Sequence, residues 1–176
     1  GLSRRYAGSP NWAGLLRAVC EGVLGDEFAY ARYDARAKTD MNAGQAISEL
    51  PHVATLMEPD VNAVLLSSRK FDAFRKVHRG DLLSGASPFK IFVADLISGY
   101  GIRHSEETKI LSKVGRDKVS GVITTNYDAL CETLFPTYET YVGERNLLFS
   151  EPSFAQEIYE IHGSTKEPDS MVLTDA

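Results

Sequence analysis

The sequence has few cysteines, no long apolar run and no excess of positive charge. Cys20 and Cys131 are its two cysteines, and neither has a second Cys or a His at metal-ligand spacing. They predict two buried, unpaired thiols, not a disulfide framework or a cysteine-based zinc site. No segment approaches the roughly 18 apolar residues of a membrane-spanning helix, and the N-terminus lacks the apolar core of a signal peptide. We therefore expect a cytoplasmic protein that does not bind membranes.

Charge and composition narrow the class of protein further. The net charge is −5 and the Lys and Arg residues are scattered, so we expect no direct binding of nucleic acid. Hydrophobic residues make up 43% and charged residues 24% of the 176 positions, which is typical of a folded globular protein. The chain opens on the loop-like Gly1-Leu2-Ser3 and stops at Leu173-Thr174-Asp175-Ala176 within an apolar pattern, so we expect a piece of a longer polypeptide.

Helical periodicity dominates the chain up to about residue 118. Ser9-Pro10 can cap and start a helix that runs to about Gly22 and carries apolar residues on one face. From about 26 to 118 the pattern predicts helices broken by short turns, with no run of alternating strand residues. Within this block we expect helices capped by Asp60, started by Ser87-Pro88, and formed around 110–114.

After Lys118 the pattern changes to short strands that end in polar turns. The β-branched run 119–124 leads into Thr125-Asn126-Tyr127-Asp128, and a helix is predicted at 129–134. Further strands are predicted at 138–142 and at 157–161, where the second ends in His162-Gly163-Ser164, and an apolar run at 171–173 closes the chain. This order of elements predicts an α/β fold.

Two of these strand ends concentrate polar side chains. In open α/β sheets, ligands bind outside the carboxyl ends of the strands, so His162 is well placed for a general base and Gly163 for close approach of a ligand. Each residue also has a structural interpretation. Asp128 can cap the following helix, Asn126 can stabilise a turn, and a single histidine is more often structural than catalytic. The spacing alone leaves both interpretations open.

Four short segments, in the right order, resemble the sirtuin (silent information regulator-type) family. Thr124-Thr125-Asn126-Tyr127-Asp128 resembles the sirtuin TQNID motif in the TTNYD form of bacterial sirtuin-like proteins, and Ile161-His162-Gly163-Ser164 resembles the family's HG element. Gly1-Leu2-Ser3 is similar to the end of the GAGxS phosphate-binding loop. Gly8-Ser9-Pro10-Asn11-Trp12 is similar to the GxPDF segment, with Asn11 and Trp12 in place of Asp and Phe.

The resemblance implies a fold and a division of the chain. The fold would be a Rossmann-like parallel sheet, incomplete at both ends of this chain, with a helical insertion module. Residues 1–25 and 119–176 would form the NAD-binding core, and 26–118 the inserted module. A turn at a helix N-terminus suits the NAD pyrophosphate because exposed amides and the helix dipole both favour anions.

The resemblance also implies roles for single residues. Asn126 and His162 would be the catalytic pair, in which Asn126 positions the ribose and the attacking water and His162 accepts a proton. Asp128 would hold the nicotinamide carboxamide. The other residues implied to contact NAD are Gly1, Ser3, Pro10, Trp12, Thr124, Thr125 and Gly163.

The segment after His162 favours NAD hydrolysis over deacylation. Sirtuin deacetylases carry a four-cysteine zinc module shortly after this histidine, whereas six residues without a cysteine separate Ser164 from Met171 here. The segment resembles the HGSxxxPxSxVLT pattern of sirtuin-like defence proteins that consume NAD. We therefore expect an NAD glycohydrolase that uses NAD as substrate and holds no zinc or other metal. The alternatives are a module that senses NAD or an ADP-ribose derivative without turnover, and an NAD-dependent protein deacylase.

The family also suggests partners. Its members typically deplete NAD in anti-phage defence by abortive infection, as homo-oligomers with a sensor or ATPase that is fused or separate. The basic pairs Arg69-Lys70 and Arg75-Lys76 predict a solvated helix face or, less strongly, an oligomer contact. The other histidines, His52, His78 and His104, have no partner at catalytic spacing and are expected to be structural or surface groups.

Overall fold

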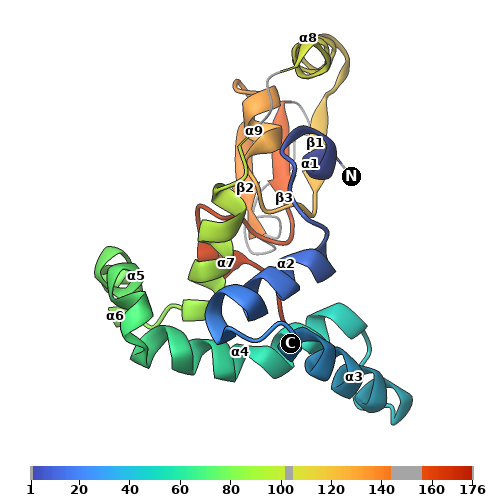
Figure 1. Ribbon diagram of the computed structural model, residues 1–176. Coiled ribbons are helices and arrows are strands. Elements are labelled where there is room, and N and C mark those ends of the chain that lie inside the picture. Colours follow the sequence, from blue (N-terminus) through green and yellow to red (C-terminus); the bar gives the residue numbers. More distant parts are fainter. Residues whose placement is uncertain (1, 102–104, 144–155, 176) are drawn as a thin grey trace. The chain divides into compact units, whose positions relative to one another are not determined.

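A three-stranded parallel sheet and a set of helices form two separate units in the computed structural model, which describes residues 2–101, 105–143 and 156–175 (Figure 1). The sheet unit comprises Gly1–Ser9 and Ala94–Met171, and the helical unit comprises Pro10–Val93 and Val172–Ala176. A parallel sheet combined with helices is the α/β, Rossmann-like fold class that the sequence predicts. The predicted boundaries of the core and the inserted module stay a prediction.

The sheet consists of β1 (Gly121–Thr124), β2 (Glu139–Val142) and β3 (Glu157–Glu160). Its order is β1-β3-β2, and both outer strands run parallel to β3. The three predicted strands are thus confirmed, with slightly later starts for β1 and β2 and an earlier end for β3. Since parallel strands end at the same edge of a sheet, the turns after β1 and β3 lie side by side.

Helices cover the sheet and complete its unit. They are α1 (Leu2–Tyr6), α8 (Glu106–Lys118), α9 (Leu130–Leu134) and the short η3 (Pro168–Ser170). The helix α9 packs against one face of the sheet, where Ile158 of β3 is completely buried (Figure 1). Around it, the core consists of Tyr6, Leu130, Cys131, Leu134, Phe135 and Tyr138. On the other face, the rings of Tyr141 and Tyr159 stack with their centroids 5.3 Å apart.

The helix α8 is longer than the sequence predicts because a capping box fixes its start. The Thr108 amide donates to Ser105 Oγ at 3.2 Å, and the Ser105 amide donates to Thr108 Oγ1 at 3.0 Å. These two bonds satisfy amides that the first helical turn leaves free. Near the other end, a Cβ on Gly115 would lie 1.8 Å from the Phe135 ring, so only glycine permits this close packing.

The helical unit contains α2 (Trp12–Val19), the π-helix η1 (Cys20–Leu24), α3 (Ala29–Asn42), α4 (Glu49–Ser67), η2 (Arg69–Phe71), α5 (Asp72–Val77) and α6 (Arg79–Leu83). The next helix, α7 (Pro88–Ser98), begins in this unit and continues into the sheet unit from Ala94. Val53, Met57, Val61 and Leu65 follow one another at four-residue spacing along α4 and are fully buried. This apolar face holds α4 to its neighbours.

Two predicted helix starts are wrong. The cap of α2 is Asn11, whose side chain accepts a 2.8 Å hydrogen bond from the Gly14 amide, and not Ser9. Asp60 lies inside α4 and caps nothing, because the buried face continues past Pro59 and packing outweighs the break that proline favours. The start at Ser87-Pro88 is confirmed.

Polar contacts hold the ends of elements in the helical unit. Arg75 donates to the carbonyls of Leu65 and Ser68 at the end of α4, so it is more than a solvated surface cation. His52 lies between two carboxylates, with Nδ1 2.9 Å from Asp175 Oδ2 and Nε2 3.1 Å from Asp40 Oδ2. This contact fixes the segment that follows Met171, which forms no strand.

Cys20 and Cys131 are buried and free, as predicted. Within the described ranges, no helix has the length and apolar character to cross a membrane.

Candidate active site

The two polar turns that the sequence singles out meet at the carboxyl edge of the sheet. Thr124, the last residue of β1, is paired with Glu160, the last residue of β3. The Ile161 amide donates to the Thr124 carbonyl at 3.1 Å, and the Thr165 amide donates to the Tyr127 carbonyl at 2.9 Å. Backbone hydrogen bonds therefore link the turn that carries Asn126 to the turn that carries His162.

The first turn is shaped by its own side chains. Thr124 Oγ1 accepts a 3.0 Å hydrogen bond from the Asn126 amide, which bends the chain directly after the strand. Asp128 Oδ1 accepts a 3.2 Å hydrogen bond from the amide of Leu130, the first residue of α9. The cap position itself is occupied by Ala129, so Asp128 stabilises the turn before the helix and is not its N-cap residue. The side chains of Asn126 and Asp128 are half-buried, whereas Thr125 is exposed.

The second turn depends on a glycine. Gly163 has φ 91°, and a Cβ at this position would lie 2.2 Å from the Ser170 carbonyl oxygen. Both the left-handed backbone and the close approach exclude a side chain. The turn is held further because the Ser164 amide donates to Ser170 Oγ at 3.0 Å. The half-buried His162 therefore stands on a backbone that is fixed on both sides.

Below these turns lies a group of charged residues that the sequence pattern did not reveal. Glu160 is fully buried, and Ser164 is 1% exposed. The pKa of Glu160 is raised to about 7, chiefly by burial and to a smaller extent by the carboxylates of Glu132 and Asp128, against the opposing effects of a hydrogen bond from Ser164 and of the charge of Lys166. Lys166 Nζ donates to Glu132 Oε1 at 2.6 Å. The available signal for this group was an acidic residue, Glu160, at the end of the strand that leads into His162.

The other residues implied to contact NAD belong to both units of the chain. Gly1 lies outside the described residues, as does His104, which was expected to be a structural or surface group and not an NAD contact. Ser3 is buried in α1, and Arg5 of the same helix forms a two-pronged ion pair with Glu107 of α8 at 2.8 and 3.0 Å. Pro10 and Trp12 belong to the helical unit. Trp12 lines a pocket of about 600 Å³ there, beside Arg17, whose guanidinium lies 4.7 Å from the Tyr30 ring centroid.

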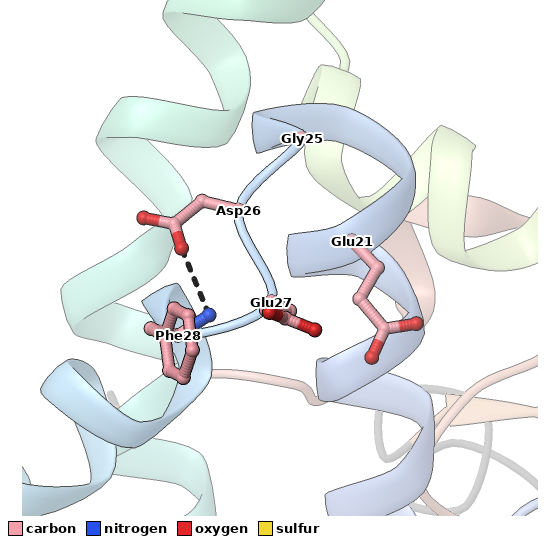
Figure 2. A pocket seen from close by; sticks show the side chains of 5 residues that line it. All are labelled: Glu21, Gly25, Asp26, Glu27 and Phe28. Carbon is pink, nitrogen blue, oxygen red and sulfur yellow. Dashed lines mark hydrogen bonds between the residues drawn. The ribbon is translucent and has the colours of Figure 1, made fainter.

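A second pocket of the helical unit holds none of the predicted site residues. Figure 2 shows it at the turn after η1, where it is lined by Glu21, Gly25, Asp26, Glu27 and Phe28. Its volume is about 650 Å³. Asp26 Oδ1 accepts a 2.8 Å bond from the Phe28 amide, and its second oxygen accepts a bond from Arg32 at 2.6 Å. The Asp26 carboxylate therefore stabilises the local turn through these hydrogen bonds.

A comparison with known protein families finds a match for the part of the chain that contains the two turns. Residues 120–176 match the family model of the SIR2-like domain. No curated protein and no solved structure matches the chain. The SIR2-like match includes Asn126, Asp128, His162 and Gly163 and extends over the sheet from β1 onward. The segments that resemble the phosphate-binding loop and the GxPDF segment lie before it.

Residues 120–176 are therefore similar to SIR2-like domains, a group of domains that bind NAD. The roles of the single residues stay predictions. In the part of the chain that the structure describes, no group of three or more His, Cys, Asp or Glu side chains is arranged to hold a metal ion. The absence of zinc likewise stays a prediction.

Proposed function

We propose that this protein is an NAD glycohydrolase, which uses water to hydrolyse NAD to ADP-ribose and nicotinamide. The observation that carries the proposal is the pairing of β1 with β3, which brings the turns of Asn126 and His162 to one edge within a SIR2-like segment. Ligands of open α/β sheets bind at this edge. The two turns combine an amide, an imidazole and a carboxylate there.

The chemistry requires orientation more than strong acids or bases. As the bond between the ribose anomeric carbon and the nicotinamide nitrogen breaks, its electron pair leaves with nicotinamide and positive charge develops on the ribose. Asn126 would orient the ribose and the attacking water through its side-chain amide. His162 would accept the proton that this water releases when its oxygen bonds to the anomeric carbon. An imidazole suits this step at neutral pH.

Asp128 would contribute in two ways. One oxygen already accepts the Leu130 amide, which fixes the direction of the carboxylate. The other would accept a hydrogen bond from the carboxamide of nicotinamide and hold the leaving group. Its negative charge would also stabilise the positive charge that develops on the ribose.

The turn after His162 supports hydrolysis over deacylation. Ser164–Ser170 is closed on itself by the bond from the Ser164 amide to Ser170 Oγ and by an isolated bridge between Ser164 and Glu167. This short, closed turn occupies the place at which sirtuin deacetylases carry their zinc module. It supports an enzyme that transfers the ADP-ribosyl group to water.

The test is to incubate the protein with NAD, with and without an acyl-lysine peptide, and to measure nicotinamide and ADP-ribose. We expect both products in equal amounts without peptide. Product only in the presence of peptide would indicate a deacylase. Binding of NAD without product would indicate a sensing module.

Two variants test whether the activity depends on the side chains at the carboxyl edge of the sheet. Asn126→Ala and His162→Ala are each expected to lower the rate of nicotinamide release by a factor of about 100 or more. Asn42→Ala at the exposed end of α3 and His78→Ala in the helical unit are the matched controls. Full activity in either site variant would refute the assignment.

The proposal includes a biological setting. We propose that the enzyme depletes NAD in anti-phage defence and acts as a homo-oligomer controlled by a sensor or ATPase. Light scattering of the purified protein and survival of phage-infected cells that express the wild type or Asn126→Ala test these two points.

A further inference from the structure

Glu160 is a buried acid that forms no ion pair with a described residue, and the Ser164 hydroxyl is the polar group that most favours its ionised form. It ends the central strand β3, its side chain is fully buried, and neither carboxyl oxygen has a hydrogen bond of good geometry to the residues described. A buried ionised carboxylate without partners is costly, and such a group takes up a proton instead. Burial accordingly raises the pKa of Glu160 to about 7.

The charged neighbours of Glu160 come from each element packed around its end of the sheet. Asp128 and Glu132 come from the start and first turn of α9, and Lys166 comes from the turn after β3. Lys166 is the cation among them, and its Nζ lies 2.6 Å from Glu132 Oε1. The second oxygen of Glu132 is buried and has no partner among the described residues. Among the described residues, ionised Glu160 would add a third carboxylate to a group that contains one lysine.

Glu160 is connected to both turns of the candidate site. Its carbonyl accepts a 3.0 Å hydrogen bond from the Gly163 amide. Thr124, which is paired with Glu160 on the neighbouring strand, accepts a hydrogen bond from the Asn126 amide through its side-chain hydroxyl. Lys166 follows Thr165, whose amide donates a hydrogen bond to the Tyr127 carbonyl. A change in charge at Glu160 that draws Lys166 away from Glu132 would therefore move the turns that carry Asn126 and His162.

We propose that Glu160 is a positioning residue whose neutral, protonated form keeps the Asn126 and His162 turns in their active arrangement. This inference rests on the proposed NAD hydrolysis and deepens it by adding control by pH. Ionisation places a negative charge beside Asp128 and Glu132 and competes for Lys166. The reactive edge is then held in a different arrangement, although no atom of Glu160 touches NAD.

The test compares the wild type with Glu160→Gln over a range of pH at saturating NAD. In the wild type, kcat for nicotinamide release should fall by about tenfold for each pH unit above about 7. Glu160→Gln keeps the shape and the neutral state, so its kcat should equal the wild-type value at low pH and stay level at high pH. The control is Glu157→Gln, which removes a carboxylate that is 6% exposed at the other end of β3 and should keep the wild-type profile.

A second readout needs no activity. In the His162→Ala background, which removes the neighbouring imidazole, the side-chain amide resonance of Asn126 in the NMR spectrum should shift with a midpoint near pH 7 in the otherwise unchanged protein and with Glu157→Gln, but not with Glu160→Gln. The same pH dependence with Glu160→Gln as without it, in either readout, would overturn the inference. An Asn126 resonance that titrates in this way, when the wild type releases no nicotinamide at any pH, would instead overturn the proposed function and leave the conformational role of Glu160 supported.

Discussion

Replacing Gly163 with alanine tests the geometry of the turn that carries His162. The φ of 91° costs about 1–2 kcal/mol for a residue with a Cβ. The added Cβ would also lie 2.2 Å from the Ser170 carbonyl oxygen and 2.6 Å from the Met171 nitrogen, which are backbone atoms that cannot rotate away. Overpacking of this kind costs about 1–3 kcal/mol more. We therefore expect Gly163→Ala to lower the free energy of unfolding by about 2–5 kcal/mol.

Gly143→Ala is the matched control in the same unit. Gly143 has a similar φ of 75°, but among the described residues its added Cβ would meet only the Ser170 Cβ, at an ordinary 4.0 Å. This variant should lose only the backbone part, about 1–2 kcal/mol. Urea unfolding of both variants and the wild type gives the difference. Equal losses in the two variants would refute the close approach of Gly163 to Ser170.

Two further predictions concern stability and pH. The pKa of Glu160 is raised to about 7, so its protonated form stabilises the fold at low pH, and this contribution of about 3 kcal/mol is lost as the pH rises from about 4.5 to about 7. The unfolding free energy of the wild type should fall over this window relative to Glu160→Gln, and parallel curves would contradict the buried acid. The pKa of His52 is raised by its bond to Asp40 and, after the opposing effect of burial, by its bond to Asp175. This stabilisation is complete below the ordinary pKa of 6.5 and is lost as the pH rises through the folded value. Urea unfolding of His52→Gln should show a loss of about 2 kcal/mol at pH 6 that shrinks at pH 8, and a loss independent of pH would contradict an imidazolium between two carboxylates.

Local signals in the sequence sufficed for the strands and for both polar turns. A short β-branched run followed by Thr125-Asn126 and the His162-Gly163 pair after another run each indicate a strand end without further context. Parallel pairing then brings such ends together. The regions that sequence reasoning predicted well are therefore those in which neighbouring residues determine the conformation.

The errors arose where distant contacts decide the structure. The helix α4 continues past Pro59 because its buried face packs along its whole length, which no local rule for proline captures. Asn11 replaces Ser9 as cap although both residue types favour that position. The burial of Glu160 follows from the central place of β3, and strand order cannot be read from a linear pattern. The resemblance located the turns but not the acid beneath them.

If this chain transfers the ADP-ribosyl group of NAD to water, the oxygen atom of that water appears in ADP-ribose, and its fate can be followed with a label. The protein is incubated with NAD in water labelled with heavy oxygen, without any peptide, and ADP-ribose is analysed by mass spectrometry. We expect one labelled oxygen per ADP-ribose, one nicotinamide released with it, and a rate lower by a factor of about 100 or more for both products in Asn126→Ala. NAD that stays intact, or nicotinamide released without labelled ADP-ribose, would contradict the proposed hydrolysis.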